Sequence, residues 1–216
     1  MSGAATGRES AQPSGRTTSA DTQRRTGPTI LGVHEYADTA IGLVSVDAAA
    51  KAAPVEVVTV RVVNPGKLVM AITGDEAAVE LGLVASSRVA GEHLLDDLFL
   101  PAVHPGVVAA LRESAWDRWD ALAILECATV TTGIAVADIA AKRAAVDVAE
   151  IRFDDSMGGR SSVRLLGPIG EINVAVAAAA EYAKRHGTLV RTVTIPNPHE
   201  DLRVHLTGGR SGDAWW

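Results

Sequence analysis

Apolar residues recur along this chain in two patterns, short β-branched runs and longer stretches with helical spacing. In the first half, Ala, Val and Ile recur at helical spacing over about 40–53, and a second helix follows Gly74-Asp75 up to about residue 90. Pro54 ends the first helix, and Asn64-Pro65-Gly66 is typical of a turn. The short runs predict strands at 31–36, 55–63, 67–73 and 94–100.

The same pattern is repeated in the second half of the chain. Residues 31–61 align without gaps to residues 122–152, at a constant offset that pairs Glu35 with Glu126 and Gly42 with Gly133. The offset grows by two residues at Gly74 and Gly167, and by two more where 100–104 matches 195–199. One register held through strand, helix and strand indicates an internal duplication.

The second half therefore has the elements of the first. We expect strands at about 121–127, 146–153, 161–166 and 188–195, and helices at 131–144, 168–185 and 198–206. The order β-α-β-β-α-β predicts an α/β (α+β) fold with a split-βαβ, ferredoxin-like topology in each half. The predicted organisation is a disordered extension (1–29), a first domain (30–112), a linker (113–120), a second domain (121–207) and a tail (208–216). Trp116 and Trp119 of the linker are expected to pack between the halves.

Composition narrows the class of protein. The chain has 216 residues, 47% of them hydrophobic, and a formal net charge of −6, which disfavours nucleic-acid binding. The N-terminus has no apolar core of a signal peptide, and no apolar run is long enough to span a membrane. We therefore expect a cytoplasmic protein with no membrane and no nucleic-acid partner.

The sequence contains few candidate residues for catalysis or metal binding. The six histidines lack the spacing of a metal site, and Cys127, the only cysteine, is interpreted as a buried small hydrophobe. Asp154 and Asp155 are adjacent acids, but a turn explains them as well as general acid–base catalysis does. The glycines near Ser156 lack the Lys-Ser/Thr ending of a phosphate loop. We expect no enzyme, with no catalytic residues, no cofactor and no metal.

Four segments carry a resemblance to a known family: LGVHE at 31–35, DAAAKAAPVEV at 47–57, Gly-Asp at 74–75 and IPNPHEDL at 195–202. They resemble the bacterial microcompartment (BMC) domain, once in each half and without circular permutation. Because single BMC domains form hexamers, the resemblance implies that a tandem chain forms a pseudohexameric homotrimer. In the family the loop between the second and third strands lines a central pore. That loop maps onto Val63, Asn64, Pro65, Gly66 and Lys67 in one half, and Asp154, Asp155, Ser156, Met157 and Gly158 in the other.

The resemblance also implies contacts at the tile edge. The family's helix-end lysine maps onto Lys51 and Lys142, each four residues after Asp47 or Asp138 and in reach of an ion pair with it. The family's Pro-Arg-Pro-His motif maps onto 196–199 and, with more departure, onto 101–104. We therefore expect edge contacts from Asp47, Lys51, His104, Asp138, Lys142, Asn197 and His199. Some tandem relatives hold an iron–sulfur cluster through a pore-loop cysteine, which this chain lacks.

The resulting hypothesis is a structural shell protein in the cytoplasm. It would tile a microcompartment shell together with hexameric and pentameric shell proteins and pass small metabolites through its pore. The alternative is a trimeric small-molecule-binding sensor on a ferredoxin-like fold.

Overall fold

The computed structural model describes residues 29–153 and 157–207. The first half contains β1 (Ile30–Tyr36), α1 (Thr39–Ala52), β2 (Glu56–Val63), β3 (Lys67–Gly74), α2 (Glu76–Ala90), β4 (Leu94–Leu100) and α3 (Pro105–Arg112). The second half contains β5 (Ala121–Cys127), α4 (Val130–Arg143), β6 (Asp147–Arg152), β7 (Ser161–Gly167), α5 (Ile169–Arg185), β8 (Leu189–Ile195) and α6 (Glu200–Thr207). A short 3-10 turn, Gly91–His93, precedes β4.

Each half forms one four-stranded sheet. The first sheet has the order β2-β3-β1-β4 and the second sheet has the order β6-β7-β5-β8. All neighbouring strands are antiparallel. This is the split-βαβ arrangement predicted from the sequence, and the predicted fold class is confirmed.

Side-chain caps mark where the equivalent helices α1 and α4 begin. The Asp38 carboxylate accepts the Ile41 amide at the start of α1, at 2.8 Å. At α4 the cap is a hydroxyl, because Thr129 accepts the Thr132 amide at 3.2 Å. Both residues are strong N-caps, since their oxygens satisfy amides that have no partner inside the helix. The two equivalent helices thus begin alike, one with a charged cap and one with a neutral cap.

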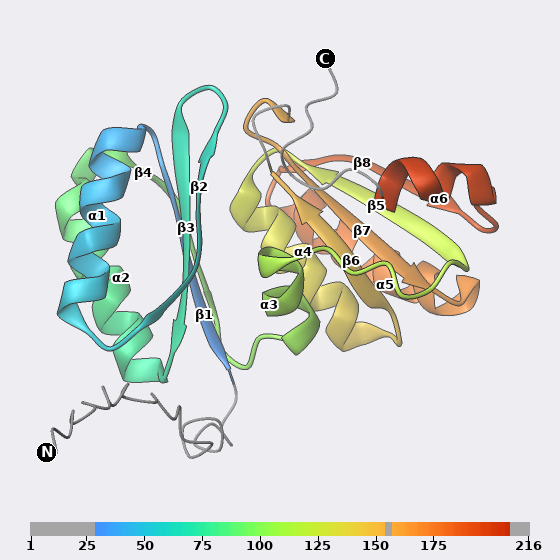
Figure 1. Ribbon diagram of the computed structural model, residues 1–216, viewed down its shortest axis with the longest axis horizontal. Helices are drawn as coiled ribbons and strands as arrows, with labels where there is room; N and C mark the ends of the chain where they lie inside the picture. Colours follow the sequence, from blue (N-terminus) through green and yellow to red (C-terminus); the bar gives the residue numbers. More distant parts are fainter. Residues whose placement is uncertain (1–28, 154–156, 208–216) are drawn as a thin grey trace, which may run out of the picture.

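The first sheet is packed on both faces, against α1 and α2 on one side and the second half on the other (Figure 1). Along β1, Ile30 and Tyr36 face α1 and α2, while Leu31 and Val33 belong to a core cluster shared with the second half. Because strand side chains alternate between faces, one seven-residue strand serves two packing layers. No residue of β1 is exposed.

Helix α4 lies between the two sheets (Figure 1). Ile134 and Ala137 of α4 pack in the cluster that contains Leu31 and Val69 of the first sheet and Leu165 of the second. The two halves therefore share one hydrophobic core. The first sheet and α3 together pack against helix α4. We name this contact the internal junction.

The opposite face of the second sheet is covered in part by the linker and α6. Trp116 and Trp119 pack against Leu122, Leu166 and Leu206, with the two indole rings 6.2 Å apart. The prediction that these tryptophans lie between the halves is wrong. The linker has to cross the second sheet to reach β5, and the large rings cover apolar side chains that would otherwise contact water.

The two ends of the chain fall outside the described residues. The predicted extension at 1–29 is described only at Thr29, and the predicted tail at 208–216 is not described. No described helix is both long and apolar enough to cross a lipid bilayer.

Candidate functional site: pore loops and docking surfaces

The predicted pore loop of the first half is the β2–β3 turn. Val63 is fully buried at its base, whereas Asn64, Pro65 and Gly66 are exposed at its tip. Gly66 has a φ of +107°, a backbone conformation that residues with a Cβ rarely adopt. The turn projects at one end of the first sheet (Figure 1).

The predicted pore loop of the second half is only partly described. Asp154, Asp155 and Ser156 lie outside the described residues, while Met157 is half-buried and Gly158 is exposed. The next residue, Gly159, lies so close to the first loop that a Cβ there would stand 2.9 Å from the Asn64 carbonyl oxygen. The first loop therefore lies beside Gly159, the residue that directly follows the second loop in the sequence.

Lys67 is held by a buried carboxylate. Its Nζ lies 2.8 Å from Glu35 Oε1, and the Glu35 side chain is 1% exposed. The other oxygen of Glu35 accepts the Val130 amide at 3.1 Å. Glu35 thus joins the pore-loop lysine to the N-terminus of α4, where a negative charge is favourable. The sequence placed Lys67 beside the pore but gave no sign of this partner.

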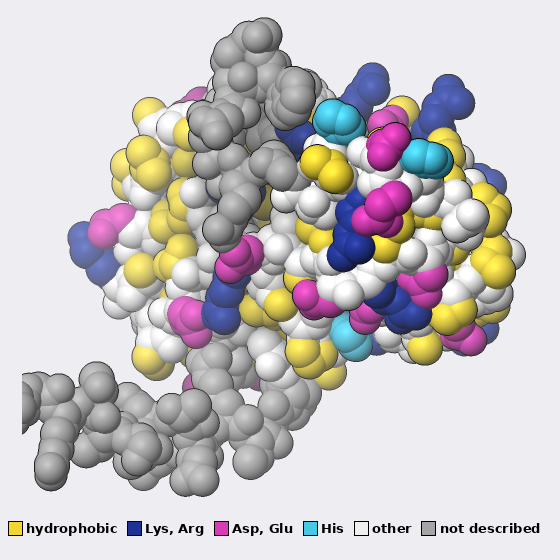
Figure 2. Space-filling view, turned by 45° about the vertical axis from the view of Figure 1, so that its right-hand side comes forward, with side chains coloured by type: hydrophobic (Ala, Val, Ile, Leu, Met, Phe, Trp, Pro, Cys, Tyr) yellow, Lys and Arg dark blue, Asp and Glu magenta, His cyan; other side chains and the backbone are white. Residues whose placement is uncertain are grey.

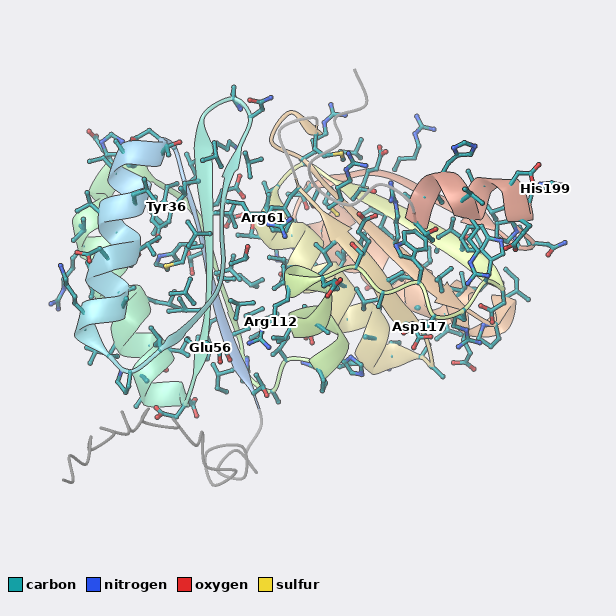
Figure 3. The ribbon with its side chains drawn as sticks, in the orientation of Figure 1. Tyr36, Glu56, Arg61, Arg112, Asp117 and His199 are labelled. Carbon is teal, nitrogen blue, oxygen red and sulfur yellow. The ribbon has the colours of Figure 1, made fainter. Side chains whose placement is uncertain are left out.

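The polar contacts of the internal junction continue along α4. The Asp138 carboxylate is 4% exposed and accepts the His104 amide at 2.8 Å, while Lys142 lies 2.6 Å from its other oxygen. Glu56 of β2 and Arg112 of α3 also form an ion pair (Figure 3). Asp138 and the His104 amide, both predicted at the tile edge, are therefore bound to one another inside the chain.

The equivalent groups in the first half remain open. Asp47 and Lys51 form the predicted i,i+4 ion pair at 2.6 Å, with side chains 58% and 75% exposed. On the same helix Leu43 is 51% exposed and Val44 55% exposed, whereas their counterparts Ile134 and Ala135 on α4 are buried. We name this surface of α1, with Leu43, Val44 and Asp47, the open helix face.

The matching surface of the second half is open as well. Ile124 and Glu126 of β5 are half-buried, while their counterparts Val33 and Glu35 are buried. Asn197 and His199 are exposed beside α6, and the Asp201 amide donates to His199 Nδ1 at 3.2 Å (Figure 3). His104 accepts the Gly106 amide at the same 3.2 Å. We name the surface with Ile124, Glu126, Arg191 and His199 the open sheet face.

A family model described as the BMC domain matches residues 31–103 and again residues 121–198. The chain belongs to the BMC-domain family. Both matches fall on the duplicated β-α-β-β-α-β units, so this is a tandem BMC shell protein. Its two BMC domains have the same strand order, as the duplication predicts.

Two relatives extend the match over almost their whole length. The chain is 31% identical to the bacterial microcompartment shell protein PduT of Citrobacter freundii, over 83% of this chain and 98% of the relative. A solved microcompartment protein from Desulfitobacterium hafniense DCB is 37% identical, with a TM-score of 0.78, over 82% and 98% of the two chains. A fused permuted hexameric shell protein, MSM0275 from the RMM microcompartment, is 20% identical with a TM-score of 0.56, over 72% and 81%, and shares the fold.

The relative PduT is named as a shell protein, which agrees with the expectation of a structural role. Within residues 29–153 and 157–207, no three His, Cys, Asp or Glu side chains gather to hold a metal ion. Burial raises the pKa of the Cys127 thiol to about 11, so it remains protonated as a small hydrophobe. On the face that Figure 2 shows, acidic and basic side chains are interspersed.

One buried polar cluster was missed by the sequence analysis. His34 and Tyr36 of β1 meet Ser86 of α2, and the two hydroxyls lie 2.5 Å apart with His34 Nδ1 3.1 Å from Ser86 Oγ. Burial lowers the pKa of His34 to about 4, against an opposing effect of Asp97. The equivalent positions of the second BMC domain hold Leu125, Cys127 and Ala179, so this difference between the repeats was the available signal.

The sensor alternative has little to support it. A polar cavity of about 270 Å³ lies at the internal junction, between β4, α4 and α5. It is lined by Asp96, Asp97, Leu98, Thr131, Thr132, Tyr182, His186 and Thr188. The relatives above are named as shell proteins or as a microcompartment protein, and none is named as a sensor.

Proposed function

We propose that three copies of this shell protein close into a ring of six BMC domains, which forms a pseudohexagonal tile with a central pore. The observation that carries the proposal is the contrast between two equivalent helices. Helix α4 buries eleven of its fourteen residues, whereas α1 buries only Gly42, Ser45 and Ala49. Because α1 exposes the apolar side chains that α4 buries, α1 is expected to have its own docking partner.

The internal junction provides the template for that partner. Inside the chain, the first sheet and α3 dock on α4. The second sheet and α6 are the equivalents of the first sheet and α3, and α1 is the equivalent of α4. The open sheet face of one copy therefore fits the open helix face of the next. Such a head-to-tail contact forms a closed ring when the rotation from one domain to the next is one sixth of a full turn. Three chains then form six equivalent junctions, three inside the chains and three between them.

One buried polar contact of the template has an open counterpart. The Asp138 carboxylate receives the His104 amide inside the chain. In the ring, Asp47 of one copy would receive the His199 amide of the next. Asp47 is 58% exposed and His199 80% exposed, so both are free to meet a neighbouring copy.

A charged residue on the open helix face tests the ring. We expect Leu43→Arg to abolish the trimer, because a guanidinium would enter an apolar contact without a partner. Leu81→Arg is the matched control. Leu81 is 52% exposed on α2, and its counterpart Val174 is 49% exposed as well, so the template does not bury this position. Light scattering should give a monomer mass for Leu43→Arg and an unchanged mass for Leu81→Arg. Equal masses for both variants contradict the proposal.

The pore follows from the neighbouring loops. Because the β2–β3 turn lies beside Gly159, just after the second loop, three copies would bring six loops to one axis. Asp154 and Asp155 would then supply six carboxylates and favour cations or polar neutral metabolites. We expect Asp154→Asn with Asp155→Asn to lower the ratio of cation to anion conductance through tiles in a planar bilayer, while the mass of the tile is unchanged. An unchanged ratio contradicts this assignment.

A further inference from the structure

Two side chains that lie close together at the internal junction, Thr129 and Asp96, have counterparts of different charge on the open faces. Thr129 caps α4, and its hydroxyl lies 3.0 Å from the Thr131 hydroxyl. Thr131 in turn donates a hydrogen bond to the Asp96 carboxylate of β4. Residues 129 and 96 are therefore separated by a single hydroxyl group at the N-terminus of α4.

The equivalent of Thr129 is Asp38, the N-cap of α1, and the equivalent of Asp96 is Arg191 on β8. Strand register supports the second assignment independently of the alignment, because Asp96 pairs with Glu35 whereas Arg191 pairs with Glu126. Glu35 and Glu126 are themselves equivalent. On the open faces, a neutral cap has become an acid and an acid has become a base.

Both charged groups are accessible. The Asp38 side chain is 40% exposed, and its carboxylate contacts His93 Nδ1 at 2.7 Å on the same half. The Arg191 side chain is exposed, and no hydrogen bond or ion pair joins its guanidinium to another described residue. Ala40 replaces Thr131, so no hydroxyl stands between the two positions and the longer arginine has room to reach the cap.

We propose that Arg191 of one copy forms an ion pair with Asp38 of the next copy, and that this pair selects which surfaces meet around the ring. The inference rests on the proposed trimer and names a contact that holds it together. Arg191 also faces the same side of the sheet as Glu126, which would approach the Thr39 amide as Glu35 approaches Val130. The guanidinium would thus stand between two negative groups, Glu126 of its own copy and the Asp38 cap of the next copy.

The same charges disfavour the docking of α1 on the first sheet, instead of the second sheet, of another copy. If α1 of one copy docked on the first sheet of another, Asp38 would face Asp96 and the buried Glu35. Lys67 pairs with Glu35, but no ion pair with a described residue neutralises Asp96, so the like charges of Asp38 and Asp96 would repel each other. The second sheet, with Arg191, attracts the same helix. The charges therefore favour alternation of first and second domains around the ring over pairing of like domains.

The test measures trimer dissociation by mass photometry over a dilution series. We expect Arg191→Glu to raise the dissociation concentration roughly ten-fold or more, since each of three junctions loses an attraction and gains a repulsion. Asp38→Asn keeps a good N-cap but removes its charge. Added to Arg191→Glu, Asp38→Asn should recover most of the lost affinity, whereas alone it should weaken the trimer a few-fold.

Lys184→Glu is the matched control, because it makes the same change of charge on α5, on the other face of the second sheet. If Arg191→Glu weakens the trimer no more than Lys184→Glu does, the ion pair is wrong although the trimer stands. If Asp38→Asn fails to rescue Arg191→Glu, Asp38 is not the partner. A wild-type chain that is monomeric at all concentrations would instead remove the proposed ring itself.

Discussion

At the scale of single residues, the polar cluster under α2 distinguishes the two domains most clearly. His34 is 3% exposed and Ser86 is fully buried, so the imidazole is held neutral. The second domain fills the same positions with Leu125 and Ala179, which are also fully buried. The first domain is therefore expected to be the more sensitive to acid.

The lowered pKa of His34 determines the direction in which stability changes with pH. Because the pKa is about 4 in the folded chain and 6.5 in the unfolded chain, the unfolded state binds the proton first as the pH falls. Stability is complete above about pH 6.5 and decreases by up to roughly 3 kcal/mol as the pH falls toward 4. Urea unfolding of wild type and His34→Leu between pH 7 and pH 4.5 checks this. His34→Leu, which copies Leu125, should lose less stability on acidification, and an equal loss would exclude His34 as the cause.

Residue pairs were only partly predictable from the sequence. The Asp47–Lys51 and Asp138–Lys142 pairs follow from helical spacing, and both form at 2.6 Å. The contacts of Glu35 with Lys67 and Val130 join distant segments, and no local spacing indicates them. The same is true of the bond between Asp138 and the His104 amide, which depends on how the halves pack.

At the scale of elements, close contact between helix and sheet depends on two equivalent glycines. A Cβ on Gly133 of α4 would lie 2.1 Å from Ser161 Oγ, and one on Gly42 of α1 would lie 2.8 Å from Leu68 Cβ. Helices built from small residues can approach a sheet this closely, which suits the 4% aromatic content of the chain.

We expect Gly133→Ala to lower the free energy of unfolding by roughly 1–3 kcal/mol, because the methyl group has no space and α4 cannot shift without disturbing two sheets. Gly170→Ala on α5 is the control, since no atom lies within 4 Å of the added Cβ. It should leave stability unchanged or raise it slightly. Chemical denaturation of the two variants compares them, and equal stabilities would mean that α4 has room to move.

The elements themselves were largely predictable, because strands and helices here have distinct apolar patterns and capping residues. The unequal burial of α1 and α4 was not. Leu43 and Ile134 are both large and apolar at equivalent positions, yet one is 51% exposed and the other fully buried. The difference arises because, within the same chain, α1 packs on one sheet whereas α4 packs between two sheets.

At the scale of the whole molecule, the proposed edge contacts can be separated from the ring. Lys51 and Lys142 have exposed side chains, at 75% and 41%, on equivalent helices. We expect Lys51→Ala with Lys142→Ala to leave the mass of the trimer unchanged and to prevent extended sheets in negative-stain images. Lys184→Ala serves as the control for loss of a surface lysine. Sheets that form as in wild type would exclude the two lysines from the tile edge.

The central claim is that the chain closes a ring of three through surfaces that copy its own internal junction. The most direct test is the absolute mass of the wild-type protein in solution, with negative-stain imaging of the same fraction. A single chain has a mass of 22.4 kDa, so the account predicts about 67 kDa and hexagonal discs. A mass of one or two chains at micromolar concentration would contradict it.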